Sequence, residues 1–159
     1  MTEITLTINK ASVYNEVAKT TSYTGAKMTG DEGAYERIFT TDDDRMMLER
    51  FWVEACSAAT EQFKPFLLSV SEQPESHGVE LDRDYSVELE LSSSFDVHLR
   101  DSIETSLFSF FVALIVGKWY RFANKPEAEA YGTEAAGMMD DVMRKIYYRK
   151  KPRRIAPVV

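Results

Sequence analysis

Residues 101–122 read DSIETSLFSFFVALIVGKWYRF, and this stretch decides the fold. Nine of the ten residues in 107–116 are apolar, with Ser109 as the exception. Charged side chains flank this run on both sides: Asp101, Glu104, Lys118 and Arg121. A membrane-spanning helix needs about 20 apolar residues, whereas a run of about 10–14 is typical of a buried core helix. We therefore predict a central core helix over 101–122 and no membrane anchor.

A second long helix is predicted before it, between Thr41 and Pro65. Thr41 stands at the N-cap position and Asp44 follows three residues later, which is capping-box spacing with Asp in place of Glu. Apolar residues then recur at helical spacing: Leu48, Trp52, Ala55, Ala59 and Phe63. Pro65 ends the helix because proline lacks the backbone donor and clashes with the preceding turn.

A third long helix is predicted from Pro126, which suits a first helical position, to the residues before Pro152. Its apolar stripe is Ala128, Tyr131, Ala135, Met139, Val142 and Ile146. A short helix is expected over 11–18, where apolar residues also recur at helical spacing. Residues 20–33 are rich in Thr, Ser and Gly, so we expect a polar loop insertion within 20–40, and a second polar loop over 71–84.

Two segments alternate between apolar and polar residues and are predicted to be short strands, residues 3–9 and 85–92. The partner of the second strand is either the first strand or a short segment near 95–97. The chain is thus expected to be a single domain, residues 1–159, of the α+β class and mainly helical. It would have three long helices and a short one, packed with a small antiparallel β element.

Composition excludes several classes of protein. The single cysteine, Cys56, rules out a scaffold stapled by internal disulfides, and two histidines do not complete an ordinary four-ligand zinc site. The first residues lack the basic and apolar regions of a signal peptide. Three consecutive acids at 42–44 suggest a hard cation, but helix capping accounts for them and calcium-loop spacing is absent. We expect no metal, no cofactor and no catalytic site, and therefore not an enzyme.

Charge is distributed unevenly along the chain. Residues 1–143 hold 26 acidic and 12 basic side chains, whereas 144–154 hold seven basic side chains and no acid. This asymmetry indicates either an interaction tail on an acidic body or cations that favour a helix C-terminus. We expect residues 150–159 to form a flexible basic tail.

Aromatic and basic residues occur together near the ends of two predicted helices. The candidate protein-interface residues are Trp119, Tyr120, Arg121, Tyr147, Tyr148, Arg149, Lys150, Lys151, Arg153 and Arg154. Such residues stack on nucleic-acid bases in some proteins and lie at the edge of the core in others. Because Tyr, Trp and Arg are enriched at protein interfaces, we favour a protein partner.

The order of these features resembles a known family. The cap at 41–44, the helix segment LERFWVEA at 48–55 and the segment ALIVGKWYR at 113–121 are similar to the small head–tail connector proteins of tailed bacteriophages and prophages, also called adaptor or head-completion proteins. The resemblance covers residues 41–122 and, more loosely, 3–19. The insertion at 20–40 and the final helix with its basic tail depart from the family pattern.

The resemblance implies a structural role. Copies of the chain would form a ring that joins the portal of the head to the tail during virion assembly, and DNA would pass through without specific binding. The expected partners are other copies, the portal and tail proteins. The chain would be a monomer in the cytoplasm of the bacterial host before it enters the virion. The alternative from another class is a small cytoplasmic helical protein that uses its basic tail on nucleic acid or a protein partner.

Overall fold

The computed structural model describes residues 1–27, 33–71 and 83–158. Most of the predicted loop at 71–84, including His77, therefore lies outside the described residues. The helices are α1 (Lys10–Lys27), α2 (Ala34–Ile38), α3 (Arg45–Phe63), α4 (Arg100–Ala123) and α5 (Lys125–Tyr147). Three short 3₁₀ turns are η1 (Asp42–Asp44), η2 (Lys64–Phe66) and η3 (Val97–Leu99). The strands are β1 (Thr2–Ile8), β2 (Leu67–Val70) and β3 (Tyr85–Leu91).

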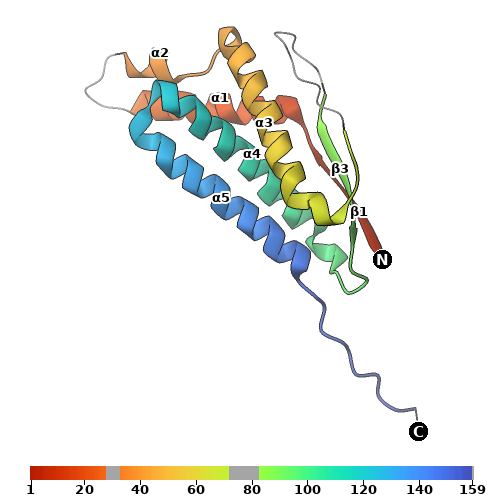
Figure 1. Ribbon diagram of the computed structural model, residues 1–159. Helices are drawn as coiled ribbons and strands as arrows, with labels where there is room; N and C mark the ends of the chain where they lie inside the picture. Colours follow the sequence, from red (N-terminus) through yellow and green to blue (C-terminus); the bar gives the residue numbers. More distant parts are fainter. Residues whose placement is uncertain (28–32, 72–82, 159) are drawn as a thin grey trace.

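The predicted fold class is confirmed: the protein is a mainly helical α+β structure with a small antiparallel sheet (Figure 1). The predicted number of long helices is wrong, because the described residues form four long helices and α2 is their one short helix. The difference lies in α1, which continues through residues 20–27 where a polar loop was expected. Residues 28–32 of that expected loop lie outside the described residues.

Tertiary packing explains why the Thr- and Ser-rich end of α1 is helical. The Thr21 hydroxyl is fully buried and donates to the Val17 carbonyl oxygen at 2.9 Å. It also accepts the Thr40 backbone N–H at 3.1 Å, which ties α1 to the chain after α2. Gly25 lies against α2 so closely that a Cβ atom there would meet the Tyr35 Cα at 2.8 Å. These residues therefore serve close helix packing rather than a loop.

Helix α4 is central, as predicted for 101–122, and holds 12 buried residues, more than any other described helix. It runs antiparallel to α5, and the two are joined at Asn124 (Figure 1). Helix α3 packs on another side of α4 and ends at Phe63, immediately before the turn that contains Pro65. At the start of η1, the Asp44 carboxylate accepts the Thr41 backbone N–H at 2.8 Å, so the predicted capping interaction is present.

The sheet has the strand order β1-β3-β2, and both pairings are antiparallel. The central strand β3 thus pairs with the N-terminal strand, one of the two partners considered, and also with β2, which the sequence pattern did not reveal. Residues 95–97 form no strand of this sheet; Val97 begins η3, and Phe95 makes only an isolated bridge to Arg149.

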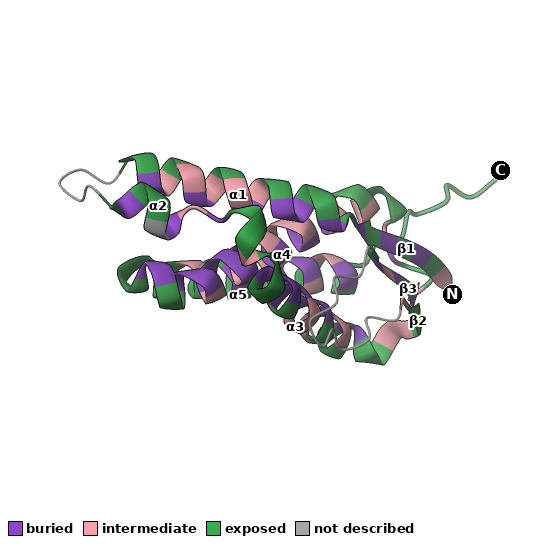
Figure 2. Ribbon diagram, turned by 90° about the horizontal axis from the view of Figure 1, so that it is seen from above, coloured by how far each residue is buried: buried purple, intermediate pink, exposed green. Residues whose placement is uncertain are grey.

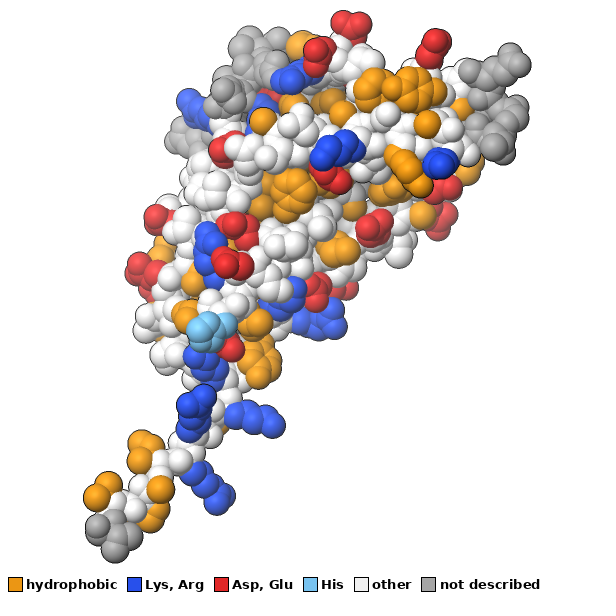
Figure 3. Space-filling view, turned by 180° about the vertical axis from the view of Figure 1, so that it is seen from behind, with side chains coloured by type: hydrophobic (Ala, Val, Ile, Leu, Met, Phe, Trp, Pro, Cys, Tyr) orange, Lys and Arg blue, Asp and Glu red, His pale blue; other side chains and the backbone are white. Residues whose placement is uncertain are grey.

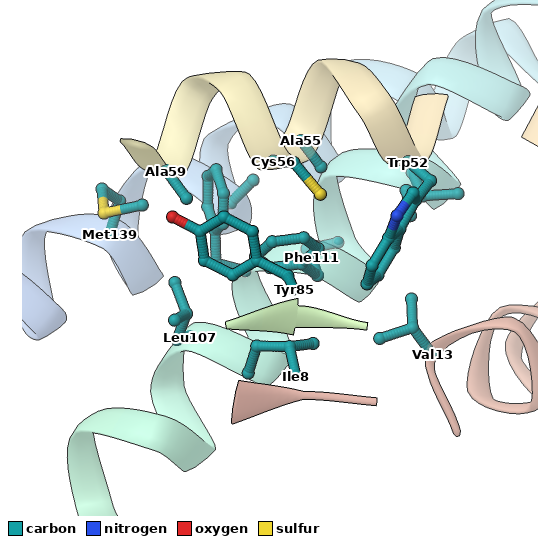
Figure 4. Packing of buried hydrophobic residues seen from close by; sticks show 14 of the residues in the cluster. Ile8, Val13, Trp52, Ala55, Cys56, Ala59, Tyr85, Leu107, Phe111 and Met139 are labelled. Carbon is teal, nitrogen blue, oxygen red and sulfur yellow. The ribbon is translucent and has the colours of Figure 1, made fainter. Parts of the chain in front are cut away.

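One face of the sheet is buried and the other is open. Tyr85, Val87 and Leu89 point into the core, where Tyr85 and Trp52 both pack against Phe111 of α4 (Figure 4). The alternate residues of β1 and β3 are exposed or half-buried (Figure 2). No helix of the described part covers that outer face.

Candidate interaction surface

The predicted interface residues at the end of α4 do not form a surface, with the exception of Arg121, which is exposed. Trp119 is only 8% exposed, and its indole N–H donates to the Ile38 carbonyl oxygen at 2.7 Å. Tyr120 is fully buried and packs edge-on against Tyr131. Burial raises the pKa of Tyr120 to about 12. Trp119 and Tyr120 are therefore core residues that join α4 to α2 and α5, which corrects their assignment to an interface.

The structure also separates the two aromatic–basic clusters. Because α4 and α5 are antiparallel, the end of α4 lies beside the start of α5. The residues around Tyr147 lie at the other end of this helix pair, and a helix of 24 residues is about 36 Å long. The predicted residues therefore belong to two distant places, and only the second is an exposed surface.

At that second place, the end of α5 is fastened to the turn before η3. The Lys150 backbone N–H donates to the Ser94 carbonyl oxygen at 2.9 Å, and Arg149 forms the bridge with Phe95. The Tyr147 ring packs edge-on against Phe66, with ring centroids 5.4 Å apart. Tyr147 and Tyr148 nevertheless remain about half exposed. The chain therefore leaves the body at a fixed point.

Hydrogen bonds to Ser106 join the last turns of α5 to α4. The Asp141 carboxylate accepts the Ser106 hydroxyl at 2.7 Å and lies 2.6 Å from the Lys145 ammonium. Hydrogen bonds from Lys145 and Ser106 hold the pKa of Asp141 below its usual range. Arg144 pairs with the other oxygen of the same carboxylate at 3.2 Å. Lys145, which also donates to the Ser106 hydroxyl of α4 at 2.9 Å, therefore stabilises the helix pair, whereas the Arg144 pair lies within α5 and leaves that side chain largely exposed.

Residues 151–158, which we call the arm, extend away from the body (Figures 1 and 3). All eight are exposed and have no regular secondary structure. Lys151, Arg153 and Arg154 form no ion pair with any described residue, and Ile155 and Val158 are 90% and 98% exposed. The arm thus carries three cations without an ion pair, and two large apolar side chains without a packing partner, among the described residues of its own chain.

The open face of the sheet has the opposite charge. Its side chains include Glu3, Glu88 and Glu90, and none of the strands contains a Lys or Arg. Glu3 and Glu90 are directly opposite each other in the β1–β3 register. Like charges at opposed cross-strand positions destabilise a sheet, so a cation brought to this pair from elsewhere would be favourable.

A hollow of about 500 Å³ opens at the end of this face near the start of the arm. Its lining includes apolar side chains from β2 and its neighbours, together with one carboxylate and one guanidinium: Met1, Phe66, Leu67, Leu68, Glu90 and Arg149. Leu68 is 48% exposed at a register shift in β2. We call this site the sheet-end hollow; sequence reasoning missed it because the four-residue strand β2 has no alternating pattern.

A buried ionic cluster between α1 and α3 was also missed. The Lys10 ammonium donates to the Glu49 carboxylate at 2.7 Å, and the Tyr14 hydroxyl donates to its other oxygen, also at 2.7 Å. Lys10 and Glu49 are each 3% exposed. Nearby Cys56 is also buried, and burial raises the pKa of its thiol, so it is a poor nucleophile at neutral pH.

We expect Glu49→Ala to destabilise the protein by about 3–5 kcal/mol, because it leaves the buried Lys10 ammonium without its carboxylate. The double variant Lys10→Met/Glu49→Gln should recover most of this loss, since it removes both charges and retains an acceptor for the Tyr14 hydroxyl. As a control, Glu54→Ala breaks a partly exposed pair with Lys118 and should cost about 1 kcal/mol or less. Urea unfolding measures all three, and equal losses for the Glu49 and Glu54 variants would contradict the assignment.

Among the described residues, no three His, Cys, Asp or Glu side chains are grouped so that they could hold a metal ion. The acids at 42–44 instead cap η1, and Asp42 lies 3.6 Å from Arg45. His98 is exposed, and its backbone N–H donates to the Asp96 carboxylate at 3.1 Å. Within the described ranges, no helix has both the length and the apolar character to cross a membrane.

Comparisons with protein-family models, with curated proteins and with solved structures found no match to this chain.

Proposed function

We propose that the protein is a structural component of a tailed-phage or prophage particle, a head–tail connector whose copies assemble as a ring between portal and tail. The single observation that carries this proposal is the exposed arm on an acidic body; it carries Ile155, Val158 and three bases that form no ion pair within the described part of the chain. Residues 1–150 hold 26 acidic and 16 basic side chains. A protein with a cationic arm and an anionic body is suited to contacts between copies.

The mode of assembly follows from the separation of these two surfaces. An arm and a body surface are different patches, so a contact between them is heterologous, and heterologous contacts generate closed rings when the rotation closes. The expected sequence of events is a monomer in the host cytoplasm and a ring in the virion. An acidic body also suits a channel through which DNA passes, because it repels phosphates.

The test is the composition of purified particles from the host that carries this gene. We expect the protein at a fixed number of copies per particle, located at the neck by electron microscopy with a labelled antibody. The genes beside it should encode portal, capsid and tail proteins. Particles that lack the protein would overturn the proposal.

The second candidate function is nucleic-acid binding by the arm, and the half-exposed Tyr147 and Tyr148 beside the basic residues favour it. This function predicts an affinity for DNA that falls with salt, with a slope of about −3 in log–log form if Lys151, Arg153 and Arg154 each contact a phosphate. Fluorescence anisotropy with single-stranded and duplex DNA measures the slope. A connector should show no such specific, salt-dependent binding.

A further inference from the structure

We infer that the arm of one copy docks in the sheet-end hollow of a second copy, with Arg153 against the opposed carboxylates Glu3 and Glu90, and with Ile155 against Leu68 and its apolar neighbours. This inference rests on the proposed function, because it specifies the contact by which copies join.

Charge complementarity selects the occupant. The strands carry Glu3, Glu88 and Glu90 without a Lys or Arg, and the opposed pair Glu3 and Glu90 would be relieved by a cation. The arm supplies three cations that have no ion pair with any described residue of their own chain. The hollow combines apolar walls with Glu90 of this acidic edge and with Arg149, and the arm combines basic with apolar side chains.

The backbone of the arm allows its basic and apolar side chains to face the hollow together. Residues 151–158 form no helix, and Pro152 and Pro157 favour an extended backbone at the residue before each of them, Lys151 and Ala156. In an extended segment, alternate side chains share a face, so Arg153 and Ile155 point to the same side. Glu90 and Leu68 both line the hollow, which therefore offers a carboxylate and an apolar wall to one face of the arm.

The direction of the arm favours a second copy over its own body. The hydrogen bond from the Lys150 N–H to the Ser94 carbonyl oxygen fixes the point of departure, and beyond it the arm extends away from the body (Figure 3). Eight extended residues span about 26 Å, which is enough to reach across to a neighbouring molecule.

Disulfide trapping between two chains of different mass tests the docking. In a Cys56→Ala background, a Leu68→Cys chain is mixed with a longer, tagged Ile155→Cys chain and oxidised. We expect a heterodimeric cross-link whose yield falls as salt is raised. The matched control is Met46→Cys, which is 57% exposed on α3, and it should give little cross-link with the same partner. Equal yields from Leu68→Cys and Met46→Cys would overturn the docking site.

Charge reversal tests the proposed ion pair. Glu90→Arg in the Leu68→Cys chain, or Arg153→Glu in the Ile155→Cys chain, should each lower the cross-link yield severalfold. The two reversals together should restore it. Failure of the combination to restore the yield would show that these charges do not meet.

A single chain with both Leu68→Cys and Ile155→Cys distinguishes docking of the arm on its own body from docking on a second copy. An internal disulfide in that chain, without the heterodimer in the mixing experiment, would show that the arm folds onto its own body and would overturn the inference. Failure of the docking site is distinguishable from failure of the proposed function, because the presence of the protein in particles is measured independently of any cross-link.

Discussion

Ala113→Asp is expected to unfold the protein, with a loss of stability of at least about 3 kcal/mol. Ala113 lies in the central helix α4 and is 3% exposed, with α1 and α5 packed on that side. A carboxylate there would be buried without a partner, and burial of an unpaired charge is among the most costly single changes. The acidic side chains Glu16 and Glu134 line the same groove and would add like-charge repulsion. Circular dichroism during urea unfolding measures the loss.

The matched control is Ala130→Asp, which places the same side chain on an exposed position of α5. The difference in helix propensity between Ala and Asp is about 0.7 kcal/mol at most, so this variant should melt close to the parent. If Ala113→Asp instead melts cooperatively and close to Ala130→Asp, α4 is not the buried centre of the fold.

The central helix could be predicted from the sequence because a run of apolar residues is by itself enough to predict burial. Nine of the ten residues between Leu107 and Val116 are apolar, and such a segment is expected in the hydrophobic core. The structure places α4 there. The cap at Thr41 and the stop before Pro65 are likewise local signals. Each depends on side-chain chemistry within a few residues, which is why the bounds of α3 were close to those expected.

The end of α1 could not be predicted in this way because its helical state depends on residues elsewhere in the chain. Thr21 is satisfied by Val17 in its own helix and by Thr40 beyond α2, and Gly25 is required by the approach of Tyr35. In isolation, the same Thr, Ser and Gly residues favour turns and loops. Tertiary packing overrides that local preference.

Only part of the candidate site could be predicted, because the rest depends on tertiary packing. The basic residues of the tail are visible in the sequence because charge is a property of composition. The inward direction of Trp119 and Tyr120 depends on the rotation of α4 relative to α2 and α5, which the sequence does not specify. The sheet-end hollow depends on the pairing of β2 with β3. That pairing could not be predicted, because β2 has no alternation of apolar and polar residues to mark it as a strand.

Truncation of the chain after Lys150 is expected to leave the body folded and to abolish its incorporation into particles. The arm makes no hydrogen bond or ion pair with other described residues, so its loss should change the free energy of unfolding by less than about 0.5 kcal/mol. Incorporation should fail because the arm carries the cations and apolar side chains assigned to the contact between copies. Particle yield, infectivity and the copy number of the protein per particle are the measurements.

The position of the truncation decides whether this experiment is informative. A cut after Lys145 would also remove Ile146, which is fully buried, and Arg149 and Lys150, which fasten the end of α5 to the turn at 94–95. Loss of a buried Ile costs about 2–5 kcal/mol. With that shorter chain, failure to enter particles could result from instability as well as from loss of the arm. A full-length variant with Lys151, Arg153 and Arg154 all changed to Gln is the matched control for charge. It should assemble poorly while melting like the parent, whereas full yields of infectious particles from the truncated chain would show that the arm has no part in assembly.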